Sequence, residues 1–400
     1  MPTTTFSPAE LARFRHDTPG CTDVIHLNNA GAALPPRAVT QAVAEHLQRE
    51  YQLGGYEAAA ERAGLSQDFY PALGDLLNAR PEQVAYATSA TDAYNKVLAS
   101  IPWRAGEVIV TTENDYVSNQ IAFLQLRDRY GVQVVRAPEC EAGGLDIDGM
   151  ARCIDQHRPR LVAVTHIPTS SGLIQNVAAV GAHCRNINCW YLVDACQSAG
   201  QLPLDVAEIG CDFLTATFRK FLRGPRGTGF LYVSDRALEA GLAPLGLDLH
   251  SADWTANDAY APADDARRFE TWERNHALMQ GAAAAARYAQ AIGLERIARR
   301  SQQLARQLRE QLAAEKQVRV LDRGEQLGAI VTCHVEGADP VQLLRSLRQR
   351  RIHTSITRLD SARLDYGRKQ VEWALRWSPH YYNNEVEIEK AVQEFFEIIC

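Results

Sequence analysis

Lys220 is placed where a primary amine can do covalent chemistry. An apolar run, Phe213–Ala216, leads into it, and a glycine-rich turn, Gly224–Gly229, leads out toward a second apolar run, Phe230–Val233. A primary amine condenses with an aldehyde to form a Schiff base, which the guanidinium of an arginine cannot do. Lysine is scarce in this chain, and the others are Lys96, Lys316, Lys369 and Lys390. The alternative is an ordinary solvated lysine on a loop.

Asp194 closes another apolar run, Trp190–Asp194. A carboxylate at the end of such a run loses solvation and needs a cation or hydrogen-bond donors as partners. The protonated ring nitrogen of pyridoxal 5′-phosphate (PLP) is such a cation, and this pairing keeps the ring an electron sink. Gln197, three residues on, is a candidate donor to the phenolate oxygen of the cofactor. The alternative is helix capping, with Asp194 as N-cap and Gln197 completing a capping box.

The run Thr88–Asp92 follows a strand and opens a helix. Free backbone N–H groups at a helix N-terminus, with small hydroxyl side chains beside them, suit a phosphate monoester. Ordinary capping is the alternative. The run Gly224–Gly229 lacks the order GxGxxG and precedes a strand, which excludes a dinucleotide loop. The candidate phosphate ligands are Ser89, Ala90, Thr91 and Thr217.

Arg376 leaves an apolar run near the C-terminus and is the candidate clamp for a substrate carboxylate. Its planar guanidinium can hold a carboxylate through two hydrogen bonds, although a structural ion pair is equally compatible with this segment. The segment His26–Ala32 offers small residues and amides that can approach a bound amino acid, with Ala30 and Gly31 as candidate contacts. A plain turn is the alternative there.

The elements that must position these residues alternate apolar runs with amphipathic helical stretches from about residue 35 to 235. Continuous apolar runs are typical of a parallel sheet covered by helices on both faces, so the pattern predicts an α/β fold with right-handed crossovers. Ligands of such sheets bind beyond the carboxyl ends of the strands. Those ends hold Thr88, Glu113, His166, Asp194 and Thr217. The predicted strands are Val84–Ala87, Val108–Thr112, Val134–Ala137, Leu161–His166, Trp190–Asp194, Phe213–Ala216 and Phe230–Val233.

The C-terminal part of the chain predicts a smaller α+β domain. Residues 240–275 are expected to be irregular, and a long helical pattern then runs from His276 to Glu315 with an interruption near Gly293. Strands are predicted at Val318–Leu321, Ala329–Val335 and Val371–Trp377, and helices at Pro340–Arg350 and Glu385–Ile399. The predicted organisation is an N-terminal segment, 1–25, packing on the small domain, a large PLP-binding domain, 26–265, and a small domain, 266–400.

Composition limits the class of protein. The 400 residues exceed one comfortable core, and 46% hydrophobic with 22% charged residues is ordinary for a globular protein. A net charge of −6 without a basic run excludes nucleic acid or an anionic membrane surface as the expected partner. No apolar stretch has the length of a signal peptide or a membrane span. The nine cysteines lack metal-like spacing, which predicts reduced thiols, no metal site and a cytoplasmic location.

Together these segments resemble the class-V aminotransferase family of PLP enzymes, over nearly the whole chain and in order. The family includes cysteine desulfurases, selenocysteine lyase, isopenicillin-N epimerase and ergothioneine-pathway C–S lyases. The resemblance rests on Asp194-x-x-Gln197, on Thr217-x-Arg219-Lys220 with the Gly-Pro-x-Gly-x-Gly that follows, and on Arg376-x-Ser378 through Tyr382-Asn383. It implies PLP fold type I, the aspartate aminotransferase-like architecture, with a mostly parallel seven-stranded sheet.

The resemblance assigns roles residue by residue. Lys220 resembles the Schiff-base lysine, Asp194 the partner of the ring nitrogen, and Arg376 the clamp on the substrate carboxylate. Family members place a ring, often histidine, over the cofactor; Tyr116 can stack here, although the usual stacking position holds Val117. The full set of predicted cofactor contacts is Ser89, Ala90, Thr91, Tyr116, Thr169, Asp194, Gln197, Thr217, Lys220 and Thr271. The predicted substrate contacts are Arg376, Ala30, Gly31 and His353.

Two departures from the family pattern shape the expected activity. The residue before the lysine is commonly histidine and is Arg219 here. Desulfurases carry a persulfide-forming cysteine shortly before the strand of the arginine clamp, whereas residues 351–370 of this chain contain no cysteine. We therefore expect a C–S lyase acting by β-elimination on a cysteine-derived amino acid. An aminotransferase or an isopenicillin-N-epimerase-like enzyme is the alternative, and a catalytically silent binding protein with the same fold is a remote one.

The resemblance also implies a homodimer whose sites lie at the subunit interface. The segment Arg268–Glu273 occupies the place from which a partner subunit donates a phosphate contact, with Thr271 as the candidate hydroxyl. An acid near the leaving sulfur is sought among His166, His353 and Tyr116. The expected small-molecule partner is an amino acid substrate.

Overall fold

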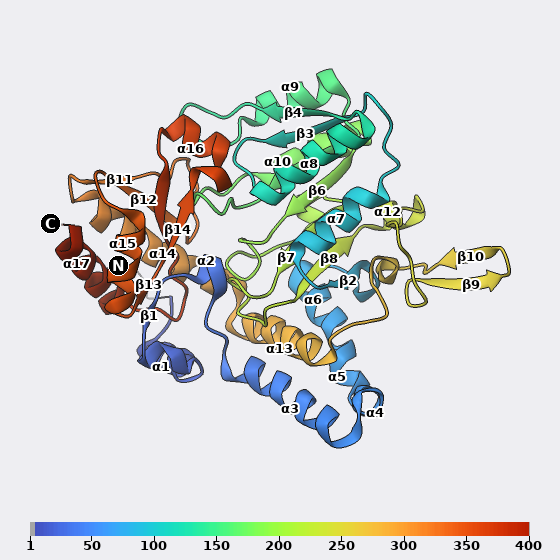
Figure 1. Cartoon of the computed structure of the whole chain (residues 1–400), viewed down its shortest axis with the longest axis horizontal. Helices are drawn as coiled ribbons and strands as arrows, with labels where there is room; N and C mark the ends of the chain where they lie inside the picture. The colour runs from blue at the N-terminus through green and yellow to red at the C-terminus, as the bar shows by residue number, and fades with distance from the viewer. Residues whose placement is uncertain (1–4, 400) are drawn as a thin grey trace.

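The large sheet of the computed structural model, which describes residues 5–399, confirms the predicted α/β architecture. Seven strands lie in the order β2-β8-β7-β6-β5-β3-β4 (Figure 1). Strand β8 runs antiparallel to both of its neighbours, and all other neighbours are parallel. The strands are β2 (Val84–Ala87), β3 (Val108–Thr112), β4 (Gln133–Ala137), β5 (Leu161–Thr165), β6 (Trp190–Asp194), β7 (Phe213–Thr217) and β8 (Gly229–Val233).

Both faces of this sheet are buried, which explains the continuous apolar runs in the sequence. In β5, Leu161 and Ala163 belong to one hydrophobic cluster and Val162 and Val164 to another, because successive side chains point to opposite faces. The first cluster includes side chains of α7 (Ala90–Ser100) and α8 (Val117–Tyr130). The second includes side chains of α6 (Phe69–Leu77), α9 (Ile147–His157), α10 (Val177–Ile187), α11 (Val206–Ile209) and α13 (His276–Ile292).

A smaller antiparallel sheet forms the C-terminal part, as predicted. Its order is β11-β12-β15-β14. Three helices bury Leu304, Leu347 and Phe395 in one cluster with Val331 and Leu375 of the sheet. The elements are β11 (Val318–Val320), β12 (Val331–Val335), β13 (Ile352–His353), β14 (Ser355–Arg358), β15 (Trp373–Trp377), α14 (Leu294–Ala313), α15 (Pro340–Gln349), η4 (Leu359–Ser361), α16 (Arg363–Lys369) and α17 (Glu385–Ile399). Of these, β13, β14, η4 and α16 were not predicted.

The N-terminal segment contacts the C-terminal part of the chain (Figure 1). The ring of Phe14 lies 5.5 Å from that of Tyr381, edge to face, and Arg15 forms an ion pair of 2.8 Å with Glu387. Strand β1 pairs in parallel with β13. The predicted limits of the three domains stay a prediction, and α13 packs in the cluster of the large sheet. The N-terminal elements are α1 (Pro8–His16), η1 (Pro19–Thr22), β1 (Ile25–His26), α2 (Asn29–Ala32), α3 (Arg37–Leu53), α4 (Gly55–Glu61), α5 (Ala63–Gln67) and η2 (Pro81–Gln83).

The expectation that residues 240–275 are irregular is wrong in part, because this segment contains two short strands and one helical turn. After α12 (Asp235–Glu239), the chain forms a hairpin of β9 (Ala252–Ala256) and β10 (Ala259–Pro262), then η3 (Ala266–Phe269). Figure 1 shows the hairpin projecting from the body of the molecule. Trp254 is 81% exposed, so no buried face imposes an apolar alternation that a sequence can reveal. Within residues 5–399, no helix is long and apolar enough to cross a membrane.

Candidate active site

Lys220 lies just beyond the end of β7 and is only 7% exposed. The backbone turns directly after it: the Arg223 N–H donates to the Lys220 carbonyl at 2.9 Å, and Arg223 itself has a positive φ of 61°. Burial lowers the pKa of the Lys220 amine, while the nearby Cys196 and Asp194 oppose that shift. A lysine with a lowered pKa presents more of the neutral, nucleophilic amine, so the solvated-loop alternative is excluded.

Asp194 ends β6 and is held by two donors. The Cys196 backbone N–H donates to its Oδ1 at 2.9 Å, and the Asn119 side-chain amide donates to its Oδ2 at 3.0 Å. Asp194 is 4% exposed, and among residues 5–399 no cation forms an ion pair with it. No helix begins at Asp194, so the capping alternative for Asp194 and Gln197 is wrong. A buried carboxylate without a cation fits a protonated ring nitrogen as its missing partner.

Thr169 joins the arginine clamp to Gln197. The Thr169 hydroxyl oxygen accepts from Arg376 Nη1 at 2.6 Å and from Gln197 Nε2 at 2.9 Å. Gln197 Nε2 also donates to the Ala30 carbonyl at 3.1 Å, so both of its amide hydrogens are used within the protein. The Thr169 hydroxyl hydrogen has no acceptor among the described residues. Thr169, more than Gln197, is therefore free to donate to a phenolate oxygen.

Arg376 has an unused donor that fits a substrate carboxylate. Its side chain is buried, and Nε has no hydrogen-bond partner among the described residues. Burial lowers the pKa of the Arg376 guanidinium to about 10, so it stays charged near neutral pH. No acidic side chain pairs with Arg376 in residues 5–399, which argues against the structural ion pair. An unpaired buried cation needs an anion, and a carboxylate supplies one.

The candidate phosphate loop opens α7. Ser89 is the N-cap, and its hydroxyl oxygen accepts from the Asp92 N–H at 3.1 Å, which leaves the hydroxyl hydrogen to donate elsewhere. Ala90 and Thr91 supply the free N–H groups of the first turn. A Cβ added at Gly229 would lie 2.6 Å from the Ser89 carbonyl carbon, so glycine allows β8 to approach this turn closely. The Thr217 hydroxyl donates to the Thr228 carbonyl at 3.1 Å, and a phosphate contact by Thr217 stays a prediction.

Tyr116 points its ring toward the candidate Schiff-base lysine. Lys220 Nζ lies 5.9 Å from the centroid of the Tyr116 ring. Tyr116 is the N-cap residue of α8, and Val117 begins the helix. Of the two positions, only Tyr116 offers an aromatic ring beside Lys220, so stacking by Tyr116 stays the prediction.

The predicted substrate contacts Ala30 and Gly31 lie beside the site through their backbone. Their carbonyl oxygens accept from Gln197 and from Arg219 Nη1, respectively. His353 contacts a residue of the same N-terminal segment: its Nδ1 is 3.3 Å from Nδ1 of His26. Burial lowers the pKa of the His353 imidazole, so the ring is more often neutral than a free histidine.

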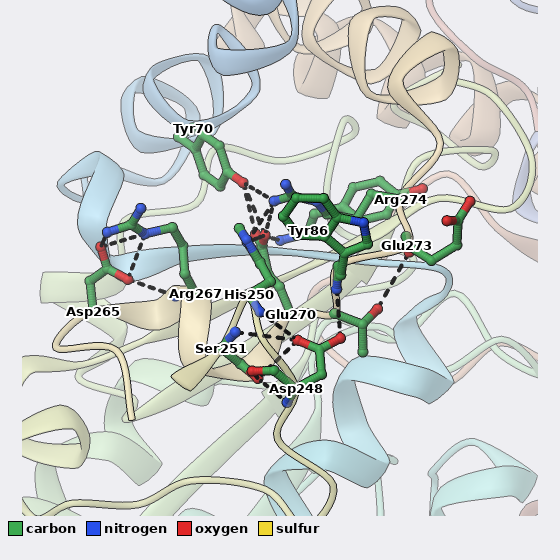
Figure 2. Close-up of polar contacts among 12 residues, drawn as sticks. Tyr70, Tyr86, Asp248, His250, Ser251, Asp265, Arg267, Glu270, Glu273 and Arg274 are labelled. Carbon is green, nitrogen blue, oxygen red and sulfur yellow. Dashed lines mark hydrogen bonds and ion pairs between the residues drawn. The ribbon is translucent and has the colours of Figure 1, made fainter. Parts of the chain in front are cut away.

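Thr271 lies apart from this group within one chain. Its hydroxyl donates to the Glu273 carbonyl at 3.4 Å, and the preceding Glu270 anchors the segment (Figure 2). The buried Glu270 carboxylate accepts from the Tyr70 hydroxyl at 3.0 Å and from the Tyr86 backbone N–H of β2 at 2.7 Å. His250 and Arg274 contact it at 2.9 and 2.6 Å. A phosphate contact by Thr271 from a partner subunit stays a prediction.

Sequence reasoning missed two polar residues of this region, Asp115 and Asn119. Asn119 contacts both Asp115 and Asp194. Their spacing of four residues was the only available signal: Asp115 lies just before the N-cap of α8, and Asn119 lies in the first turn of that helix.

The geometry fits PLP. A buried lysine, an unpaired carboxylate, a free hydroxyl and a helix N-terminus correspond to the aldehyde, ring nitrogen, phenolate oxygen and phosphate of that cofactor. Residues 351–370, where the resemblance places a reactive cysteine in desulfurases, form β13, β14, η4 and α16 and contain no cysteine.

Comparisons with known proteins agree with this geometry. The model of the family "Aminotransferase class-V" matches residues 25–391. A "Probable cysteine desulfurase" of Methanothermobacter thermautotrophicus is 27% identical over 396 residues, which are 96% of this chain and 97% of that protein. A "Probable hercynylcysteine sulfoxide lyase" of Mycobacterium tuberculosis is 28% identical over 361 residues, with 90% and 86% covered.

The solved structures show the same fold. The apo structure of the cysteine desulfurase from Thermococcus onnurineus NA1 superposes with a TM-score of 0.88 at 24% identity, covering 97% of this chain and 98% of that one. The family and its solved homologues use PLP, and one homologue was solved with glycine covalently linked to that cofactor. The match over nearly the whole chain leads to one conclusion: this protein belongs to the aminotransferase class-V family.

Proposed function

We propose that this chain is a PLP-dependent C–S lyase that acts by β-elimination on a cysteine-derived amino acid, without a persulfide-forming cysteine. The observation that carries the proposal is the segment before β15: it leads into the Arg376 clamp, yet residues 351–370 contain no cysteine. The similarity to cysteine desulfurases and to a hercynylcysteine sulfoxide lyase supports sulfur chemistry on an amino acid.

Each candidate residue has a defined task in this reaction. PLP, when bound, supplies an electron sink for the charge that develops at Cα. Arg376 holds the substrate carboxylate and orients the Cα–H bond. The Lys220 amine, kept partly neutral by burial, takes the Cα proton. Asp194 would accept the N–H of the cofactor ring nitrogen, and Thr169 would donate to the phenolate oxygen.

The elimination step breaks the Cβ–S bond. The electron pair leaves with sulfur, which takes a proton to give a thiol, and water converts the remaining three-carbon fragment to pyruvate and ammonia. The acid is sought between Tyr116 and His353. His166 fits this role poorly, because burial lowers the pKa of its imidazole to about 4 and leaves it neutral.

Cys196 is the cysteine beside the candidate lysine, and its environment argues against persulfide chemistry. Burial raises the pKa of the Cys196 thiol, and the negative charge of Asp194 adds to that rise. A thiol that stays protonated is a poor nucleophile. We therefore expect Cys196→Ser to retain lyase activity, whereas a desulfurase that used Cys196 would lose it.

The deciding experiment supplies the purified protein, loaded with PLP, with an S-alkyl cysteine in one arm and with free cysteine, from which the released sulfur compound is hydrogen sulfide, in the other. We expect pyruvate, ammonia and a thiol in equal amounts, and no sulfur bound to any cysteine of the protein by mass spectrometry. An aminotransferase would transfer the amino group to a 2-oxo acid without forming pyruvate. An epimerase would exchange the Cα proton without releasing sulfur. A catalytically silent binding protein would bind the substrate unchanged. Persulfide on any cysteine of the protein, with Cys196 beside Lys220 as the first to check, would overturn the proposal.

We also propose that the protein acts as a homodimer with the site near the interface. Helices α3 and α4 expose Tyr51 by 87% and Tyr56 by 78%, and the β9–β10 hairpin exposes Trp254. Large exposed apolar side chains of this kind favour association. Light scattering of the wild type and of a Tyr51→Glu, Tyr56→Glu double variant tests this. A wild-type monomer with full cofactor occupancy would refute it.

A further inference from the structure

A hydrogen-bond chain connects Asp194 to Arg136 of β4. It begins at Arg136 of β4, whose guanidinium donates to Gln120 Oε1 at 2.9 and 3.2 Å. Gln120 Nε2 then donates to Asp115 Oδ2 at 2.7 Å. Asn119 Nδ2 donates to Asp115 Oδ1 and to Asp194 Oδ2, each at 3.0 Å. Two buried carboxylates therefore share one amide group.

The orientation of each amide in this chain is fixed by its neighbours. The Asn119 amide lies between two carboxylates, so it must present its NH₂ group to both, because its oxygen would repel them. Arg136 occupies the Gln120 oxygen, which leaves the Gln120 NH₂ group for Asp115. The Asp115 carboxylate also accepts the Tyr116 backbone N–H at 2.6 Å and the Thr165 hydroxyl. Asp115 therefore acts as an acceptor toward every one of these partners.

The second carboxylate, Asp115, lies in a buried environment with few titratable neighbours. Asp115 is 7% exposed, and burial raises the pKa of its carboxyl while the hydrogen bonds from Thr165, Gln120 and Asn119 oppose the rise. Asp194 and the Tyr94 phenol are the other titratable groups that face Asp115; burial and both carboxylates raise the pKa of Tyr94, which keeps it neutral. Hydrogen bonds to both oxygens therefore hold the Asp115 carboxylate in place.

We propose that Asp115 is a positioning residue that, through Asn119, fixes the orientation of the Asp194 carboxylate toward the ring nitrogen of the cofactor. The inference rests on the PLP chemistry of the proposed function. Without Asp115, the Asn119 NH₂ group loses one of the two carboxylates that orient it, so the hydrogen bond that aligns Asp194 with the ring nitrogen is held less firmly. The ring nitrogen then holds its proton less firmly.

The test uses the holoenzyme loaded with PLP that carries ¹⁵N in the ring, compared as wild type, Asp115→Asn and Asn119→Leu. The ¹⁵N chemical shift reports protonation of the ring nitrogen directly and does not depend on turnover. We expect a protonated-ring shift in the wild type and a displacement toward a neutral pyridine in both variants. Turnover should fall by about tenfold or more, the typical effect of one charge-assisted hydrogen bond. Asp128→Asn, at an exposed position of the same helix, is the matched control and should leave both readouts unchanged.

The outcomes separate a failure of the proposed function from a failure of the role of Asp115. If the wild type binds no PLP or shows no β-elimination, the proposed function fails. If the wild type binds PLP and both variants keep the wild-type ¹⁵N shift, the role of Asp115 is refuted while the proposed function stands. Because Asp115→Asn can also impair folding, Asn119→Leu provides a second route that leaves the donors from Thr165, Gln120 and Tyr116 on Asp115 in place.

Discussion

The hydroxyl oxygen of Thr169 lies 2.6 Å from Nη1 of Arg376 and 2.9 Å from Nε2 of Gln197. The substrate clamp and the candidate donor to the cofactor therefore share one atom. Because that oxygen accepts twice, its hydrogen is directed away from both partners. A single side chain thus couples the position of the arginine to the environment of the phenolate oxygen.

Thr169→Val should weaken substrate binding and alter the cofactor spectrum together. Valine keeps the volume but removes the acceptor, so Arg376 loses one of its hydrogen bonds and its orientation. We expect KM to rise about tenfold, the cost of one hydrogen bond to a charged group, with a shift in the visible absorption of the bound cofactor. Thr169→Ser retains the hydroxyl and should restore both. A valine variant with wild-type KM and spectrum would contradict the coupling.

The stability of the apoprotein should depend on pH through Lys220. Burial lowers the pKa of its amine in the folded chain, whereas the unfolded chain has a pKa of about 10.4. Between those two values the unfolded chain binds more protons, so the free energy of unfolding rises with pH there. Below the lowered pKa both states are protonated and the full cost of burying the charge remains.

Urea unfolding of the apoprotein and of Lys220→Met over about pH 7 to 10 measures this effect. The stability advantage of the methionine variant should shrink as the pH rises. Lys316→Met, at an exposed position, should follow the wild type. A constant difference between wild type and Lys220→Met over the whole range would show that Lys220 titrates as an ordinary lysine.

The strands of the large sheet were predictable because burial on both faces leaves a continuous apolar signature. β2, β3 and β6 have the predicted bounds, and their ends are where the site residues gather. The β9–β10 hairpin gave no such signature, since Trp254 and Tyr260 face water. Helix α16 has seven residues, four of them charged. It is therefore too short for a helical period to be recognised in the sequence.

The site was predictable only where one segment carries the chemistry. Asp194 ends β6 and Lys220 follows the end of β7 by three residues, and that local context makes them candidates. Asp115, Asn119 and Arg136 come together only when β3, β4 and β6 lie in one sheet, so their network is a property of the topology. The hydrogen bond from the Thr217 hydroxyl to the Thr228 carbonyl likewise depends on the pairing of β7 with β8, which the local sequence does not reveal.

Arg223→Lys should destabilise the protein and loosen its N-terminal segment. Arg223 is 2% exposed and donates to the Leu34 carbonyl at 2.8 Å, to the Thr18 hydroxyl and to the Tyr381 hydroxyl. Its guanidinium also lies 4.4 Å from the centroid of the Tyr382 ring. A lysine cannot reach three acceptors in this fork geometry, so we expect a loss of about 2–4 kcal/mol in the free energy of unfolding.

Denaturant unfolding and limited proteolysis check this prediction together. The variant should be cleaved faster within residues 5–24, because Arg223 ties Thr18 to the turn after Lys220. Arg152→Lys, at a side chain that is 70% exposed, should change neither measurement. Equal stability and equal cleavage in Arg223→Lys would show that the buried fork contributes nothing.

Glu270→Gln should destabilise the edge of the large sheet and also weaken the binding of PLP through its phosphate. The Glu270 side chain is fully buried and accepts from Tyr70, His250, Arg274 and the Tyr86 backbone N–H (Figure 2). Glutamine has one acceptor oxygen, and its NH₂ group would face donors, so we expect a loss of about 3 kcal/mol. Because β2 continues from Tyr86 into the Ser89 loop, PLP should dissociate faster from the variant than from the wild type. Glu239→Gln, at an exposed position, is the control. Thermal unfolding together with PLP release measures both effects, and unchanged release with lowered stability would confine Glu270 to the sheet edge.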